Sequence, residues 1–86
     1  MTQNQAVEQA IEIKSKYEKK LLQLANVVGV GVGYKLVGGQ QTDTISVIAN
    51  VVQKKPISQL ARQDVVPAEL DGILTDVQEV GRFRAQ

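Results

Sequence analysis

Apolar residues recur every three or four positions over residues 4–25, which is the spacing of one face of an α-helix. The stripe contains Ala10, Ile13, Tyr17, Leu21 and Leu24, and Val7 and Ile11 widen it. The remaining positions are mostly charged or amide side chains, so the opposite face is polar. The pattern predicts an amphipathic helix of about six turns that packs on a core through one side.

The spacing of apolar residues changes to two after Asn26, which is typical of β-strands. Between residues 27 and 37, one face is apolar and the opposite face is rich in glycine. The glycine face carries Gly29, Gly31 and Gly33. Because glycine normally weakens a strand, we expect another backbone or a helix to approach this face closely. A turn over residues 38–43 and a second apolar run over residues 44–53 complete the pattern of an antiparallel hairpin spanning residues 27–53.

The rest of the chain predicts a connection and one more strand. Residues 54–72 break both periodicities and are expected to form a connection with one short helical turn. Gly72 follows an aspartate at the end of this segment, where glycine readily supplies a turn. Residues 73–80 predict a last strand, and residues 81–86 a tail. The order predicts a single α+β domain over residues 1–86, in which a long N-terminal helix and a small, mainly antiparallel sheet form two layers.

The composition limits the chemistry that this domain can perform. Its 86 residues include no cysteine and no histidine, and 43% of them are hydrophobic and 22% charged. These proportions are typical of a small folded domain rather than a disordered segment. Without cysteine and histidine, the chain has no thiolate nucleophile, no disulfide and neither the usual general base nor the commonest metal ligands. We therefore expect no enzymatic activity, no cofactor and no bound metal.

The location of the protein is predicted from what the sequence does not contain. No segment resembles a signal peptide, because the first residues mix polar and apolar side chains. No apolar run approaches the ~18 residues of a membrane-spanning helix. We therefore expect a cytoplasmic protein that does not associate with membranes.

Charge adds one local feature. Ten basic and nine acidic residues leave a net charge of +1, which predicts no general attraction to nucleic acid or to an anionic membrane. Four lysines nevertheless crowd the second half of the expected helix: Lys14, Lys16, Lys19 and Lys20. These lysines could contact phosphate in a small nucleic-acid-binding or regulatory domain. Acids on the same helix and the absence of interleaved aromatic residues favour a solvated helix face instead.

The glycine run over residues 29–33 invites comparison with phosphate-binding loops. A dinucleotide fingerprint needs glycines at the first, third and sixth positions, and here Tyr34 stands at the sixth. A phosphate loop also leads into a helix, whereas here the strand pattern continues. We therefore interpret the glycines as a packing feature.

Two further groups of residues come close to known chemistry. Ser58 could act as a nucleophile with Lys54 or Lys55 as its base, although capping the short helical turn is its more ordinary role. Three acidic residues lie close together in the sequence: Asp71, Asp76 and Glu79. Their spacing matches no calcium loop, and turn chemistry or solvent exposure explains them.

A series of short motifs follows the expected helix in a defined order. They are Asn26-Val27-Val28-Gly29-Val30-Gly31-Val32-Gly33-Tyr34-Lys35, Thr42-Asp43, Lys54-Lys55-Pro56, Val66-Pro67-Ala68-Glu69-Leu70-Asp71-Gly72, Thr75-Asp76-Val77 and Gly81. This ordered set resembles the short N-terminal region that precedes the trypsin-like peptidase domain in a group of bacterial proteins. The resemblance covers about two thirds of the chain, from Asn26 to the end.

The resemblance carries no catalytic residue to this chain. In that family the His, Asp and Ser of the triad lie in the downstream peptidase domain, and this sequence stops at Gln86, where that domain would begin. The resemblance therefore implies a noncatalytic accessory module. Such a module would self-associate or dock a peptidase-like partner.

The second strand offers the candidate contact surface. Apolar residues lie on both faces of this strand, which in so small a domain indicates burial against another chain. The candidate contact residues are Ile45, Val47, Ile48, Val51 and Val52. We therefore expect a homo-oligomer or a complex with a peptidase-like protein, and a nucleic-acid partner remains the alternative.

Overall fold

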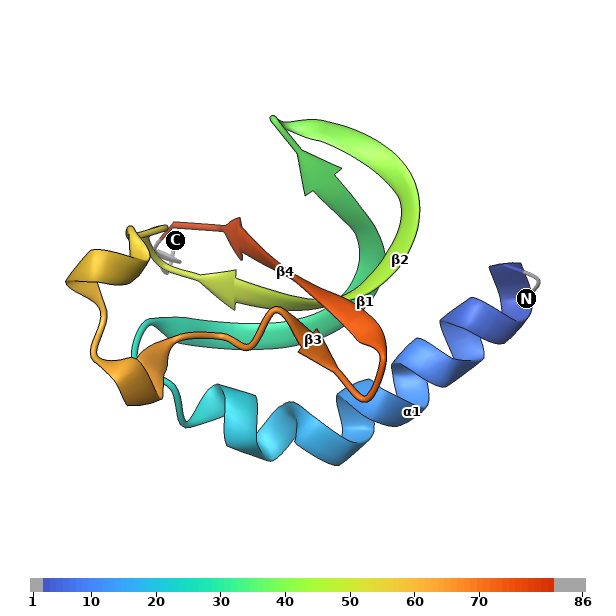
Figure 1. Cartoon of the computed structure of the whole chain (residues 1–86), viewed down its shortest axis with the longest axis horizontal. Coiled ribbons are helices and arrows are strands. Elements are labelled where there is room, and N and C mark those ends of the chain that lie inside the picture. The colour runs from blue at the N-terminus through green and yellow to red at the C-terminus, as the bar shows by residue number, and fades with distance from the viewer. Residues whose placement is uncertain (1–2, 82–86) are drawn as a thin grey trace, which may run out of the picture.

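The computed structural model describes residues 3–81 and shows one helix packed on a four-stranded mixed sheet (Figure 1). The elements are α1 (Gln3–Leu22), β1 (Val27–Val37), β2 (Gln40–Val51), the 3₁₀ turns η1 (Ile57–Gln59) and η2 (Arg62–Asp64), β3 (Glu69–Leu70) and β4 (Ile73–Glu79). This arrangement confirms the predicted α+β class and the order helix, strand, strand at the start of the chain. The expected tail at residues 82–86 lies outside the described residues.

The four strands lie in the order β1-β2-β4-β3. β1 and β2 form an antiparallel hairpin, in which Val32 pairs with Val47. β4 lies on the other side of β2 and runs parallel to it, with Thr75 beside Val47, whereas β3 is antiparallel to β4. A parallel neighbour needs a crossover that returns the chain to the starting end of the first strand. Residues 52–72 make that crossover, so β2 and β4 are the central strands of the sheet.

Two-residue turns close both hairpins. Between β1 and β2, Gly38 and Gly39 have φ angles of 59° and 81°. Between β3 and β4, Asp71 and Gly72 have φ angles of 48° and 88°. Paired left-handed residues match the right-handed twist of the strands that they connect. The first turn is therefore shorter than the expected span of residues 38–43. The second turn connects β4 to the short strand β3, which the sequence pattern does not predict.

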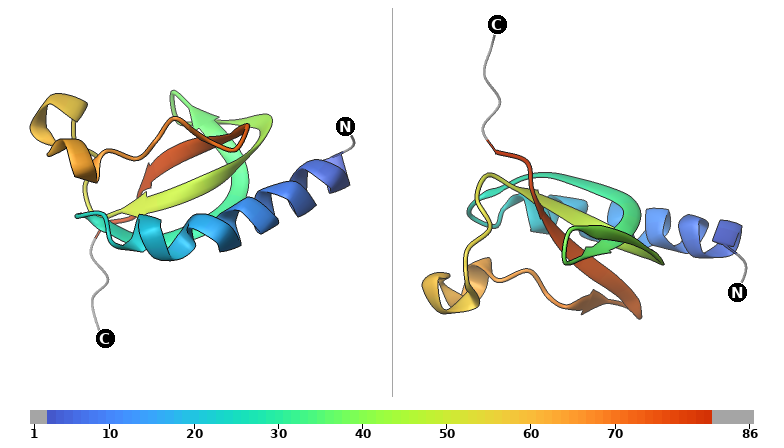
Figure 2. Two further views of the ribbon diagram at one scale, coloured as in Figure 1. Left: turned by 60° about the horizontal axis from the view of Figure 1, so that its bottom comes forward. Right: turned by 90° about the horizontal axis from the view of Figure 1, so that it is seen from above.

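α1 lies across one face of the sheet and buries much of the predicted stripe against it (Figure 2). Leu21 is 3% exposed and meets Val47 and Leu70 in the core. The partly buried residues around this core include Ile13, Tyr17, Leu24 and Val30. Ile11, which we expect from its position to widen the stripe, is 50% exposed, so that side of the helix faces solvent.

The helix ends at Leu22, three residues before the predicted end at residue 25. The amides of Gln23 and Leu24 donate to carbonyls three residues earlier, which tightens the last turn. Asn26 then adopts a left-handed φ of 77°, and the chain turns into β1. Neither α1 nor any other helix in the described part of the chain is long and apolar enough to span a membrane.

The far ends of β1 and β2 bend over the face of the sheet opposite α1 (Figure 1). The Leu36 amide donates to Asp76 Oδ2 at 2.9 Å, and Lys35 Nζ donates to the Thr75 carbonyl at 2.8 Å. Asp76 and Ser46 lie on this face and are buried although both are polar, with 7% and 0% of their surfaces exposed. The bent hairpin therefore covers part of the face that α1 leaves open.

The glycine face of β1 lies on the same side of the sheet as Asp76. A Cβ added at Gly31 would meet nothing within 4 Å, so the expected close approach is wrong at this position. A Cβ added at Gly33 would lie 2.8 Å from Ile48 Cδ1, and one added at Gly29 would lie 3.4 Å from the Asn50 side chain. The neighbours at these two positions are side chains of β2 rather than a helix or a second backbone, because α1 packs on the opposite face.

Candidate interaction surface

The outer edge of β1 is the longest strand edge without a partner in residues 3–81. β1 has 11 residues and pairs only with β2, whereas β3, at the opposite edge of the sheet, has two residues. The free N–H and C=O groups of an edge strand can pair with a strand of another chain. Three apolar side chains of β1 are exposed as well: Val28 by 45%, Leu36 by 39% and Val37 by 59%.

The features that protect edge strands from association lie only near the ends of β1. Protected edges carry charges, proline or bulges. β1 has no proline, and its one charged residue, Lys35, donates to the Thr75 carbonyl under the hairpin. Its bulges lie near its two ends, so the pairing with β2 is regular from Gly29 to Tyr34. This regular stretch is where a further strand can be added.

The candidate contact residues of β2 lie inside the domain instead. β2 is a central strand, and Val47 and Val51 are 0% and 4% exposed. Ile45, Ile48 and Val52 are half-buried. α1 covers one face of this strand and the bent hairpin covers part of the other, so its burial requires no second chain. The apolar pattern of β2 follows from its place in the sheet, and the candidate contact surface moves to β1.

The four helix lysines do not form one free basic patch. Lys14 pairs with Glu18 at 2.9 Å, and Lys16 pairs with Asp71 at 2.7 Å. The other two lie exposed in the last turn of α1, where cations interact favourably with the helix dipole. Because acids of the same chain already neutralise two of the lysines, the helix is a weak candidate for phosphate binding.

Asp71 ties α1 to the turn between β3 and β4. Its carboxylate accepts hydrogen bonds from Lys16 Nζ at 2.7 Å and from the Tyr17 hydroxyl at 2.9 Å. These donors, with Lys16 first, hold the pKa of Asp71 below its ordinary value of 3.8. The hydrogen bond to Asp71 is also the main reason that the pKa values of Lys16 and Tyr17 are raised. The three side chains therefore form one ionic contact between the helix and the second hairpin.

This contact predicts a loss of stability in acid. A carboxyl group with a lowered pKa stabilises the folded state above its unfolded pKa, and the contribution is lost as the pH falls through the folded value. We expect Asp71→Asn to lower the melting temperature at neutral pH, and the two proteins to converge as the pH falls toward about 2. Thermal denaturation followed by circular dichroism across this range measures the difference.

Asp43→Asn is the matched control for this measurement, because Asp43 is an exposed acid of β2 that forms no ion pair with the residues described. Its melting temperature should follow that of the wild type at every pH. A difference between Asp71→Asn and the wild type that stays constant down to the lowest pH would contradict the ionic explanation.

The other acidic candidates are separated, and each has its own partner. Asp76 accepts the Leu36 amide beneath the bent hairpin, and Glu79 Oε1 accepts the Lys54 amide at 2.8 Å. Within the described range, no group of three or more acidic residues is placed to hold a metal ion. Ser58 is exposed and lies inside η1 rather than before it, so it does not cap this turn as expected.

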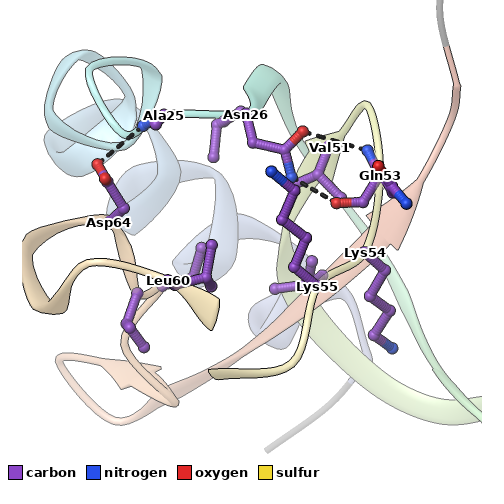
Figure 3. A pocket seen from close by; sticks show the side chains of 12 residues that line it. Ala25, Asn26, Val51, Gln53, Lys54, Lys55, Leu60 and Asp64 are labelled. Carbon is purple, nitrogen blue, oxygen red and sulfur yellow. Dashed lines mark hydrogen bonds between the residues drawn. The ribbon is translucent and has the colours of Figure 1, made fainter. Parts of the chain in front are cut away.

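A pocket opens where the end of β2 faces the 3₁₀ turns (Figure 3). It has a volume of about 220 Å³. Its apolar lining consists of Ala25, Val27, Val51, Leu60, Val65, Val66 and Val77. Its polar lining includes Asn26, Gln53, Lys54, Lys55 and Asp64. These residues come from segments that are far apart in the chain, so periodicity and motif spacing do not indicate the pocket.

Asn26 holds one wall of this pocket in place. Its side-chain amide donates to the Gln53 carbonyl, and its side-chain oxygen accepts the Gln53 amide at 3.2 Å (Figure 3). Asparagine adopts the left-handed conformation more readily than most other residues. An asparagine between a helix pattern and a strand pattern is the sequence signal that could have identified this turn.

No protein-family model matches the chain, and no curated protein matches it either. The resemblance to the region that precedes a trypsin-like peptidase domain therefore rests on the sequence motifs alone.

Proposed function

We propose that this protein is a noncatalytic interaction module that pairs with a second copy of itself through the outer edge of β1. The observation that carries the proposal is the regular stretch from Gly29 to Tyr34, whose outer side has no partner strand within residues 3–81. Exposed Val28 and Val37 flank this stretch. Addition of a strand would satisfy the free backbone groups and cover these apolar side chains at the same time.

An antiparallel pair of β1 strands about a two-fold axis suits this edge. A register centred on Val32 places Val28 of one copy opposite Leu36 of the other, next to Val37. Both ends of the paired region then have an apolar contact, and the outward backbone groups of the regular stretch from Gly29 to Tyr34 pair between them. A two-fold contact uses the same surface on both copies, as in most homodimers, so it needs no complementary surface elsewhere on the domain.

The noncatalytic part of the proposal follows from the side chains that the chain offers. The sequence has no histidine and no cysteine, which removes the usual bases and the most reactive nucleophile. The carboxylates of Asp71, Asp76 and Glu79 accept hydrogen bonds from separate partners. An interaction role uses the features that are present, a free edge and exposed apolar side chains.

A peptidase-like protein is the second candidate partner for the same edge. The sequence motifs from Asn26 onward support it through their resemblance to a region that precedes peptidase domains. Strand addition also joins unlike chains, so the proposed surface is unchanged. A partner strand would compete with the second copy for β1.

Sedimentation equilibrium tests the self-pairing. We expect the average mass of the wild-type protein to rise toward that of a dimer at tens of micromolar. Val28→Lys and Val37→Lys should each return the protein to a monomer, because a charge placed on the edge opposes pairing. Leu22→Lys is the matched control, since Leu22 is 45% exposed but lies on α1, and it should dimerise like the wild type.

Two outcomes would contradict the proposal. A wild-type protein that stays monomeric over the whole concentration range removes self-pairing and leaves the peptidase-like partner. Dissociation caused equally by Leu22→Lys would place the contact away from β1. Circular dichroism of each variant shows whether the domain is still folded.

A further inference from the structure

We propose that the pocket beside Asn26 is a binding site for a small aliphatic carboxylate. The carboxylate group would lie at Lys55, and the hydrocarbon part would lie against Leu60 and Val77. The β1 edge contributes nothing to this pocket beyond its first residue, Val27, so the site is independent of the proposed self-pairing.

The size of the pocket limits the ligand. Pockets for drug-sized molecules have volumes of about 300 to 1,000 Å³. The pocket beside Asn26 has a volume of about 220 Å³, which suits a small molecule or the end of a longer one. A branched chain of about five or six carbons is in this range, by order of magnitude.

The lining of the pocket favours a ligand with an apolar hydrocarbon part. Leu60 and Val65 come from the crossover, Val51 from the end of β2, and Val77 from β4. Their hydrocarbon side chains line a hollow at the end of the sheet. An aliphatic group placed there is removed from water, which is the main source of favourable free energy for a ligand of this kind.

The charges at the pocket favour an anion at one end. The Lys55 side chain runs along the pocket toward Asn26, whereas Lys54 points away from it (Figure 3). Lys55 forms no ion pair with any residue in the described range, so its ammonium group is available to a ligand. The one acid in the lining, Asp64, lies at the opposite wall, where it accepts the Ala25 amide at 3.0 Å. A carboxylate is therefore expected at the Lys55 end.

Hydrogen bonds hold the walls of the pocket before any ligand arrives. Asn26 joins the start of β1 to the end of β2 through both the amide and the carbonyl of Gln53. Asp64 joins the crossover to the turn after α1 through the Ala25 amide. A preformed site loses less conformational entropy on binding than a mobile one, so a small ligand can bind measurably.

Titration of the ¹⁵N-labelled protein with 4-methylpentanoate, followed by NMR, tests the proposal. We expect saturable shifts of the Asn26, Leu60 and Val77 amides with a dissociation constant of about a millimolar, as is usual for a ligand of this size. The uncharged 4-methylpentanamide and the cationic 3-methylbutylamine should bind more weakly. Titrations with N-acetyl-leucine and N-acetyl-leucinamide repeat the comparison of acid and amide for a peptide-like ligand. Tighter binding of N-acetyl-leucine than of 4-methylpentanoate would identify the C-terminus of a peptide as the source of the carboxylate.

Two variants locate the charge and the apolar site. Lys55→Gln should weaken binding of the carboxylate about fivefold and leave the affinity for the amide unchanged. Lys54→Gln should change neither affinity. Leu60→Trp should fill the pocket and abolish binding of both. Equal affinity for the carboxylate, the amide and the amine, or no saturable shift of the three reporter amides with any of them, would overturn the proposal. The Lys55→Gln comparison keeps the test valid if Leu60→Trp fails to fold.

Discussion

Asp76→Ala is expected to lower the free energy of unfolding by about 2 to 4 kcal/mol. Asp76 is 7% exposed, and its carboxylate accepts the Leu36 amide at 2.9 Å and Gln78 Nε2 at 3.0 Å, with Lys35 Nζ 3.7 Å from the other oxygen. Alanine would leave the partly buried Leu36 amide without its acceptor and the Lys35 ammonium without its counter-ion, which costs more than the lost hydrogen bonds alone. The bent hairpin would then be held to β4 by the hydrogen bond from Lys35 to the Thr75 carbonyl without the one from Leu36 to Asp76.

Urea denaturation at neutral pH and at one fixed protein concentration measures this effect. Asp76→Asn keeps an oxygen that can accept the Leu36 amide but removes the charge, so we expect a smaller loss of about 1 kcal/mol. Glu79→Ala is the control on the same strand, because Glu79 is exposed and accepts the Lys54 amide. Equal effects of Asp76→Ala and Glu79→Ala would mean that Asp76 does not hold the hairpin.

Asn26→Ala is expected to lower the free energy of unfolding by about 2 to 4 kcal/mol, for two separate reasons. Alanine at a φ of 77° is strained by its Cβ, and it also lacks the two hydrogen bonds to the Gln53 backbone. Asn26→Gly removes the hydrogen bonds but tolerates the left-handed conformation, so it should be less harmful than alanine. The expected order of stability is therefore asparagine, glycine, alanine.

The same urea measurement separates the two contributions of Asn26. The difference between the glycine and alanine variants reports the backbone strain, and the difference between the wild type and the glycine variant is dominated by the hydrogen bonds. An alanine variant as stable as the glycine variant would show that residue 26 leaves the left-handed region at no cost. The turn between α1 and β1 would then not depend on a left-handed residue.

The helix and the first hairpin could be predicted because they depend on local patterns. The stripe that includes Ile13, Tyr17 and Leu21 has the helical period, and these residues pack at the core. Alternation from Val27 onward identifies the strands of the hairpin. In both cases, the residues that determine the element are neighbours in sequence, so a short window contains the information.

The remaining features depend on contacts between distant residues. Buried Asp76 accepts the amide of Leu36, which is 40 positions earlier in the chain, and no local pattern predicts that contact. The short strand β3 has two residues, fewer than a periodicity can reveal. For β2, the sequence pattern predicts that both apolar faces are buried, but it does not indicate whether this chain or another one covers them.

The glycine face shows why the expectation of a close neighbour at a strand glycine can be right at one position and wrong at the next. Gly33 lies against the end of the Ile48 side chain, whereas Gly31 has open space above it, although both occupy the same face of β1. The curvature of the hairpin changes what lies above successive positions. Alternation along a strand predicts the face of a residue, but the bend of the sheet determines its neighbours.

The parallel pairing of β2 with β4 creates a competition, in the newly made chain, between completing the fold and associating with other copies. The β1–β2 hairpin joins residues that are close in sequence and closes a turn of two residues, so it forms with little loss of chain entropy. β4 can join only after the crossover of residues 52–72 has brought it back to the same end of the sheet. Until then the inner edge of β2, a strand rich in apolar residues, is open to any strand that meets it. Docking of β4 covers this edge of β2, and the long edge that remains in the finished domain is β1.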